Sequence, residues 1–175
     1  MQFETQRLLV RSPVESDGID IYNEYTTDNE VTKYLCWKTH TSPTESVDWI
    51  KSCILRNDGI KAVVFSVINK ESKSCIGMID VKIDGFKCNF GYVLSKQHWN
   101  KGIMTEAMKP VINYLIKDRP DIIRIFATHD IENPASGIVM QKLGMQYEGT
   151  LRSYIIHPNI SNKPRDSKMY SIVKQ

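Results

Sequence analysis

Apolar residues recur along the chain with two spacings, and the order of the segments that carry each spacing predicts the fold. Alternating or continuous short apolar runs predict about seven strands, at residues 3–11, 62–68, 75–83, 87–94, 122–128, 146–156 and 167–174. Apolar residues three and four apart predict about four helices, at residues 17–25, 42–59, 102–117 and 133–144. This order predicts an α+β fold. Because no repeat, linker or low-complexity segment interrupts it, we expect one domain over residues 1–175.

Capping residues mark the ends of two predicted helices. Ser42 precedes Pro43, so the serine is expected to cap a helix whose first residue is the proline. Asn133 precedes Pro134 in the same way and is a candidate cap for the last helix. Pro110 falls within the helix predicted at 102–117, where it should produce a kink unless that helix begins later.

The strand at 87–94, the helix at 102–117 and the strand at 122–128 form a βαβ unit. The two strands are therefore expected to be parallel and joined by a right-handed crossover. Ligands of such units bind at the carboxyl end of the first strand, beside the N-terminus of the helix. The stretch "QHWNKGIMTEAM", which contains Lys101 and Gly102, lies at that point.

Gly102 has two interpretations. A helix N-terminus presents free N–H groups and about half a positive charge, so a glycine there can allow a phosphate to approach the backbone. The alternative is a loop that only needs a glycine for its turn. Neither G-x-x-x-x-G-K-[ST] nor G-x-G-x-x-G is present, so this one glycine does not decide between the two.

Composition excludes several classes of function. The net charge is +3 without a basic block, which gives no support for nucleic-acid binding. No apolar run approaches the roughly 20 residues that a membrane helix needs, and the N-terminus lacks the layout of a secretion signal. We therefore expect a cytoplasmic protein with no membrane partner. The four cysteines are widely spaced, so buried free thiols are expected and no metal site.

Two longer motifs change the interpretation of the glycine. "FGYVLSKQHWNKGIMTEAM" is followed about thirty residues later by "ENPASGIVMQKLGMQYEG". Together they resemble the GNAT superfamily of acetyl-CoA-dependent N-acetyltransferases, and within it the branch of the ribosomal-protein and polyamine acetyltransferases. The opening "ETQRLLVR" and the closing "LRSYII" and "RDSKMYSIV" fit the same branch. The resemblance implies a central mixed, mostly antiparallel sheet of about seven strands flanked by about four helices, with acetyl-CoA as co-substrate.

The resemblance also implies which residues hold the coenzyme. The family's phosphate loop falls on residues 99–104, where only the central glycine, Gly102, is kept; Asn100 and Met104 replace small residues, and Met104 could crowd the pyrophosphate. One N–H near Val93 or Leu94 would polarise the thioester carbonyl. The implied coenzyme-binding residues are Tyr92, Val93, Leu94, Trp99, Asn100, Lys101, Gly102, Ile103, Met104, Thr105, Asn133, Ser136 and Lys142. Bland alternatives stay open: core strand for residues 92–94, a helix cap for Asn133 and a solvated helix face for Lys142.

The proton-transfer groups are less clear. Many relatives carry a glutamate where this chain has Asn89, and many polyamine relatives carry a tyrosine where it has Met140; neither can transfer a proton. Ser136 is the candidate proton donor to the coenzyme sulfur, or else an N-terminal helix residue that bonds the backbone. Glu106, Glu148, Tyr154 and His157 are further weak candidates.

The acceptor site is implied between the first helices and the last hairpin. Its candidate residues are Tyr34, Trp37, Asn89 and Tyr154, although a buried aromatic is the commoner role for a tryptophan such as Trp37. We expect an N-acetyltransferase acting on a protein N-terminal α-amine or a small amine, as a monomer or homodimer. The alternatives are a non-catalytic acyl-CoA-binding module and a structural or interaction protein.

Overall fold

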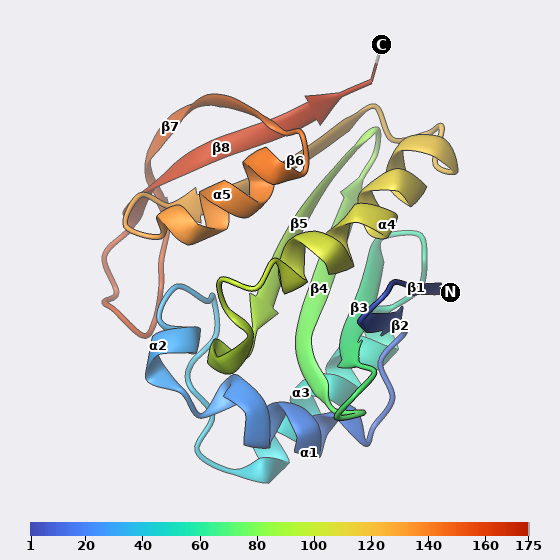
Figure 1. Cartoon of the computed structure of the whole chain (residues 1–175). Helices are drawn as coiled ribbons and strands as arrows, with labels where there is room; N and C mark the ends of the chain where they lie inside the picture. The colour runs from blue at the N-terminus through green and yellow to red at the C-terminus, as the bar shows by residue number, and fades with distance from the viewer. Residues whose placement is uncertain (175) are drawn as a thin grey trace.

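The computed structural model describes residues 1–174, in which eight strands form one sheet in the order β1-β2-β3-β4-β5-β6-β8-β7 (Figure 1). The strands are β1 (Gln2–Glu4), β2 (Leu8–Arg11), β3 (Ala62–Asn69), β4 (Cys75–Asp84), β5 (Lys87–Leu94), β6 (Arg124–Asp130), β7 (Gln146–Ile155) and β8 (Arg165–Val173). The helices are α1 (Asp17–Ile21), α2 (Asn29–Thr32), α3 (Pro43–Arg56), α4 (Ile103–Lys117) and α5 (Pro134–Lys142). The predicted mixed α and β architecture is confirmed.

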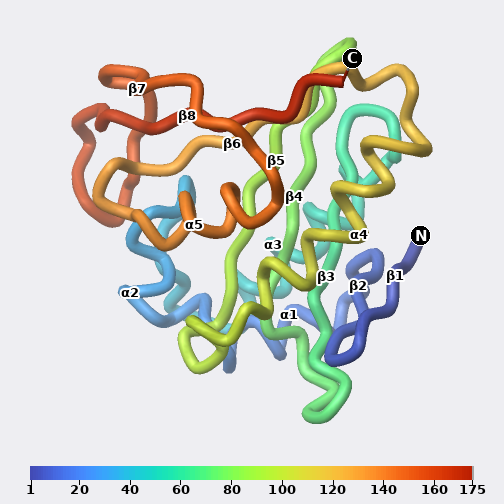
Figure 2. Tube along the Cα trace, turned by 45° about the horizontal axis from the view of Figure 1, so that its top comes forward, coloured from blue at the N-terminus to red at the C-terminus, as the bar shows by residue number. Residues whose placement is uncertain are grey.

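Every neighbouring pair of strands is antiparallel except β5 and β6, which are parallel. The βαβ unit predicted from the sequence is therefore confirmed, with α4 as its crossover helix. The parallel ladder is short: it pairs residues 87–89 of β5 with 124–126 of β6, although both strands continue beyond it. Figures 1 and 2 show the two strands diverging past these pairs. We call the gap beyond Asn89 and Phe126 the β5–β6 opening.

Helices cover both faces of the sheet. α4 and α5 lie on one face, where Ala107, Met108, Val111 and Met140 pack with strand residues in the larger apolar cluster. α1 and α3 lie on the other face, where Ile21 and Ile50 belong to a second cluster. Alternation along each strand divides the core in this way, because successive side chains point to opposite faces. The β5–β6 opening therefore connects two differently covered faces.

Two predictions about the N-terminal part are wrong. Residues 3–11 form two strands rather than one, because the polar stretch at 5–7 turns the chain and the Thr5 N–H donates to the Leu8 carbonyl at 2.9 Å. The short helix α2 was not predicted. The side chain of Asp28 caps it by accepting from the N–H groups of Glu30 and Val31, a local signal too short to give an apolar period.

The cap prediction for α3 is confirmed, since the Ser42 hydroxyl accepts from the Glu45 N–H. Asn133 does precede α5, but its side chain makes no capping hydrogen bond. α4 begins at Ile103 and runs through Pro110 to Lys117, so the alternative of a later start is wrong. Cys53, Cys75 and Cys88 are buried free thiols as predicted, whereas Cys36 is exposed.

Within residues 1–174, no helix is long and apolar enough to cross a membrane, and no three metal-binding side chains come together. The cytoplasmic location stays a prediction.

Candidate functional site

The loop before α4 has the conformation that a backbone anion site needs. Asn100 (φ 58°) and Gly102 (φ 71°) both adopt left-handed conformations, which asparagine and glycine tolerate best. A Cβ atom at Gly102 would meet only the Arg7 guanidinium, at 4.0 Å, so the glycine leaves the backbone open on this side. The first helical bond is from the Glu106 N–H to the Gly102 carbonyl, which leaves the preceding N–H groups of α4 for a ligand.

The concern that Met104 crowds this loop is not supported. The side chains of Ile103 and Met104 are buried in the larger apolar cluster, so they point into the protein and away from the loop surface. The Trp99 indole N–H donates to the Leu94 carbonyl at 2.8 Å, which ties the loop to the end of β5. These three residues therefore anchor the loop, and a ligand would meet backbone rather than their side chains.

A hollow of about 450 Å³ lies beside the N-terminus of α4, and we call it the α4 hollow. It is lined by Gln6, Gly102, Thr105, Glu106, Lys109 and Lys142. Lys142 comes from α5, so the structure does bring it to the glycine loop. The two lysines and the helix N-terminus together give this hollow a positive character suited to phosphate groups.

Arg7 and Glu106 support the loop from the N-terminal segment, a role the sequence did not predict. The Glu106 carboxylate accepts from the Thr5 hydroxyl, the Arg7 N–H and the Arg7 guanidinium. A second nitrogen of that guanidinium donates to the Lys101 carbonyl at 3.1 Å. Because Glu106 is bound in this way, it is unsuited to act as the base.

The edge of β5 that faces the β5–β6 opening carries unpaired backbone groups. The Ser95 N–H donates to the Ile76 carbonyl, and the Val93 carbonyl lies next to Gly77, so both face β4. Successive N–H groups of a strand point to opposite sides, so the Leu94 N–H points away from β4, toward the opening. Of the two candidates for polarising a carbonyl, the geometry favours Leu94 over Val93.

α5 places two predicted residues at the opening. Asn133 does not cap the helix with its side chain, which leaves its amide free for a ligand. The Ser136 hydroxyl lies 2.8 Å from the Tyr92 hydroxyl, which also lies 2.8 Å from the Ser136 carbonyl. Burial raises the pKa of Tyr92, so this phenol stays protonated and acts as a donor. Ser136 thus bonds a side chain across the opening as well as the backbone of its own helix.

A second cavity, of about 300 Å³, passes through the β5–β6 opening, and we call it the inter-strand cavity. Among the predicted residues, it is lined by Tyr34, Asn89, Tyr92, Asn133, Ser136 and Met140. Trp37 and Tyr154 do not line it. Trp37 packs on Trp49 with ring centroids 5.5 Å apart, at the edge of the second apolar cluster, so its role is packing. Tyr154 is exposed on β7, where its side chain points to the other side of the strand.

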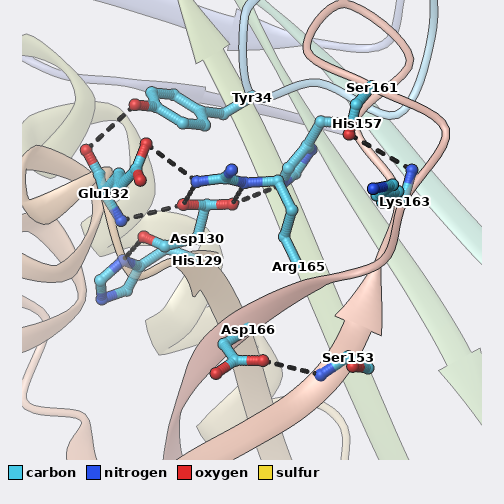
Figure 3. Close-up of polar contacts among 10 residues, drawn as sticks. All are labelled: Tyr34, His129, Asp130, Glu132, Ser153, His157, Ser161, Lys163, Arg165 and Asp166. Carbon is cyan, nitrogen blue, oxygen red and sulfur yellow. Dashed lines mark hydrogen bonds and ion pairs between the residues drawn. The ribbon is translucent and has the colours of Figure 1, made fainter.

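Figure 3 shows a polar cluster at the end of β6 that the sequence did not predict. Asp130 is buried, and its carboxylate accepts from Arg165 Nε at 2.6 Å, from Arg165 Nη2 at 3.1 Å and from the Glu132 N–H at 2.9 Å. His157 Nε2 lies 3.4 Å from the same carboxylate. Burial alone would raise the pKa of Asp130, but the bonds from Arg165 and Glu132 outweigh it and hold that pKa below its usual value.

Two buried histidines flank this cluster and line the inter-strand cavity. The His129 Nδ1–H donates to the Asp130 carbonyl at 2.8 Å, while its Nε2 has no partner among the described residues. Burial lowers the pKa of His129, so the ring is neutral near pH 7. Neither ring nitrogen of His157 has a hydrogen-bond partner in the described chain. The 35 residues between Asp130 and Arg165 explain why no sequence motif indicated the cluster.

Comparison with known proteins agrees with this geometry. The model of the acetyltransferase (GNAT) domain matches residues 7–146. The chain is 32% identical to the N-acetyltransferase YnaD of Bacillus subtilis over 177 residues, which cover 100% of this chain and 98% of YnaD. A crystal structure of a GNAT-family acetyltransferase from Bacillus anthracis superposes with a TM-score of 0.83 and 30% identity, covering 99% of this chain and 98% of that one. The [ribosomal protein uS5]-alanine N-acetyltransferase of Escherichia coli is 28% identical over 99 residues, covering 54% of this chain and 50% of that enzyme.

Proposed function

Since the chain belongs to the GNAT acetyltransferase family and is an acetyl-CoA-dependent N-acetyltransferase, we propose that its acceptor is the α-amino group at the N-terminus of a protein. The similarity to an enzyme that acetylates the alanine of ribosomal protein uS5 supports this acceptor class. A small amine is the second candidate. The single observation that carries the proposal is the inter-strand cavity, which joins the coenzyme side of the sheet to the face covered by α1 and α3.

The residues present fit acetyl-CoA. The left-handed loop at Asn100 and Gly102, the free N–H groups of α4 and the lysines of the α4 hollow suit its phosphates. The unpaired edge of β5 suits an extended amide-bearing arm, because such an arm can bond to the backbone as an added strand does. Asn133, whose amide has no capping bond, lies where it can bond the same arm. The bound coenzyme supplies an activated acetyl thioester.

The protein's own groups then have two tasks at the reacting atoms. The Leu94 N–H points into the β5–β6 opening, where it can stabilise negative charge that develops on the thioester oxygen. The Ser136 hydroxyl, held by Tyr92 at 2.8 Å, can give a proton to the departing sulfur. Neither task needs a metal ion or a covalent acetyl-enzyme.

An acceptor screen tests the proposal. Peptides that begin with alanine or serine are offered with acetyl-CoA, beside the same peptides with a blocked N-terminus, spermidine and an aminoglycoside. Products are measured by mass spectrometry, because the exposed Cys36 would react with thiol reagents. We expect acetylation of free peptide N-termini and none of the blocked ones. Turnover of small amines alone would transfer the proposal to them. Binding of acetyl-CoA without any product would indicate a non-catalytic module.

Substitution of Ser136 tests its role as the proton donor. We expect Ser136→Ala to lower kcat by about 100-fold, the lower end of the range for general acid catalysis, and to leave acetyl-CoA affinity nearly unchanged. Tyr92→Phe, which keeps the ring but removes its hydroxyl, should lower kcat by less. Unchanged turnover of Ser136→Ala would remove the serine from the mechanism.

A further inference from the structure

Alternation along β4 places charged residues on the face of the sheet that borders the inter-strand cavity. Ile79 and Val81 are buried in the larger apolar cluster beneath α4. Asp80 and Lys82 therefore point to the opposite face, and both line the inter-strand cavity. This is the face from which an acceptor reaches the β5–β6 opening, because α4 and α5 cover the other one.

Asp80 lies one cross-strand position away from Asn89. In the register of β4 and β5, Lys82 pairs with Asn89 and Asp80 pairs with Gly91. Asp80 and Asn89 are therefore diagonal neighbours on one face, whose separation in antiparallel pairs is about 7–8 Å and within reach of a side chain. A carboxylate at Asp80 can serve the same space as one at position 89.

Gly91 leaves that space open. It is exposed although it lies in a central strand, and a Cβ atom built there would meet no atom within 4 Å. The residue directly across from Asp80 thus has no side chain to cover the carboxylate. An amine that enters the cavity can reach Asp80 over Gly91.

The Asp80 carboxylate is held on one side and free on the other. Its Oδ1 accepts from Arg56 Nη1 at 2.7 Å, and the Arg56 guanidinium lies 5.8 Å from the ring centroid of Trp49. Oδ2 has no hydrogen-bond partner among the described residues, and the side chain is 28% exposed. The ion pair with Arg56 favours the charged carboxylate. The result is an oriented, accessible proton acceptor.

The other candidates in the cavity are less suited to this role. The Asp130 carboxylate has no exposed surface, and Arg165 and the Glu132 N–H already occupy it. The ring nitrogens of His157 are buried away from solvent, so an acceptor amine cannot reach them without displacing neighbours. Of the carboxylates that line the cavity, Asp80 is the accessible one.

We propose that Asp80 binds the ammonium form of the acceptor and takes its proton, which is the role that Asn89 cannot perform. The nitrogen then carries a lone pair that forms the C–N bond to the acetyl carbonyl carbon, and the C–S bond breaks. The second proton lost by the nitrogen balances the proton gained by the departing sulfur, so the products are the amide, the thiol and one proton released through Asp80. This inference deepens the acetyl transfer proposed above and holds for either class of acceptor.

Several groups set the charge around Asp80. They are Arg56 and Cys53 of α3, Lys82 of β4, Tyr34 and Cys36 after α2, and Asp130, His129 and His157 across the cavity. Arg56 and Lys82 are the cations nearest to it along the chain and the sheet, and they favour release of the proton once it has been taken up.

The test compares Asp80→Asn with Asp84→Asn. Asp84 lies on the same strand and face, but it is exposed, pairs with Lys87 and does not line the cavity, so its substitution is a matched control. Kinetics use the peptide or small amine with the highest turnover in the acceptor screen. We expect Asp80→Asn to lower kcat/KM by about 100-fold or more while acetyl-CoA affinity, measured by calorimetry, stays unchanged. Asp84→Asn should behave as wild type.

The pH profile separates proton transfer from a structural effect. In the wild type the ammonium form of a peptide is productive, so kcat/KM should stay nearly level between about pH 6 and the α-amine pKa of about 8. In Asp80→Asn only the neutral amine reacts, so kcat/KM should rise about tenfold per pH unit over that range. Adding Asn89→Glu to Asp80→Asn should raise activity above that of Asp80→Asn alone.

A kcat/KM that stays within about tenfold of wild type, or a loss without the new pH dependence, would overturn the role of Asp80. Failure of the peptide acceptor alone would not do so, because the same comparison then runs on the small amine that is turned over. The two proposals therefore fail through different measurements.

Discussion

The position of α5 on the sheet depends on the absence of a side chain at Gly137. A Cβ atom there would lie 2.6 Å from His129 Nε2 and 3.1 Å from its Cε1. The imidazole cannot easily move away, because it is buried, stacks on Tyr170 with ring centroids 5.6 Å apart and donates to the Asp130 carbonyl. We therefore predict that Gly137→Ala destabilises the protein, although alanine is the better helix former.

The size of the effect follows from two opposing contributions. Overpacking of a filled interior costs about 1–3 kcal/mol, whereas replacing glycine by alanine inside a helix gains about 1 kcal/mol. The expected net loss is up to about 2 kcal/mol. For a chain of this length, such a loss corresponds to a decrease in Tm of about 4–8 °C. Because Ser136 precedes Gly137, a shifted helix should also lengthen the contact with Tyr92 and lower kcat.

Urea unfolding of four proteins tests the reasoning: wild type, Gly137→Ala, His129→Ala and the double variant. His129→Ala removes the ring that the new methyl group would meet. In that background Gly137→Ala should be neutral or stabilising, by up to the roughly 1 kcal/mol of helix propensity. An equal loss of stability from Gly137→Ala in both backgrounds, or a gain in the wild type, would refute the proposed clash.

Three further predictions concern the same region and the loop before α4. Arg165→Met should cost about 3–5 kcal/mol in urea unfolding, because it leaves the Asp130 carboxylate buried without its ionic partner; a loss below about 1 kcal/mol would contradict this. Gly102→Ala should weaken acetyl-CoA binding in calorimetry and cost about 1–2 kcal/mol of stability, because alanine disfavours the left-handed conformation; unchanged affinity would argue against the phosphate role. The folded-state pKa of His129 is lowered by burial, so the unfolded chain binds its proton more readily, and stability should fall as the pH drops below about 6.5; His129→Gln should reduce that slope.

Most of the fold could be predicted from local patterns. Alternation gave the strands, capping residues gave the start of α3, and the βαβ unit gave the one parallel pair of strands. The errors lie where the local signal is short. The turn at residues 5–7 contains no glycine or proline to mark it, and α2 has only four residues. A helix of one turn has no apolar period for a pattern to reveal.

The candidate site was predictable only in part. Gly102, Asn133 and Ser136 belong to motifs that are continuous in sequence, and the structure places all three at the α4 hollow or the inter-strand cavity. The sequence "IDVKID" does show that Asp80 alternates with apolar residues. It does not show which face of the strand borders a cavity, because that depends on how α1 and α3 pack. The pairing of Asp130 with Arg165 depends likewise on the register of β6 and β8.

The short parallel ladder has a mechanical consequence. With only residues 87–89 and 124–126 paired, the sheet is two plates joined at a hinge, one of β1 to β5 and one of β6 to β8. A change in the angle between the plates widens or narrows the gap while the antiparallel ladders within each plate stay intact. A ligand that bonds to the free edge of β5 and to α5 at once would lock this angle. Amide exchange at the Leu94 N–H should therefore slow when the coenzyme binds, and the hinge itself becomes a means of coupling coenzyme binding to the shape of the acceptor side.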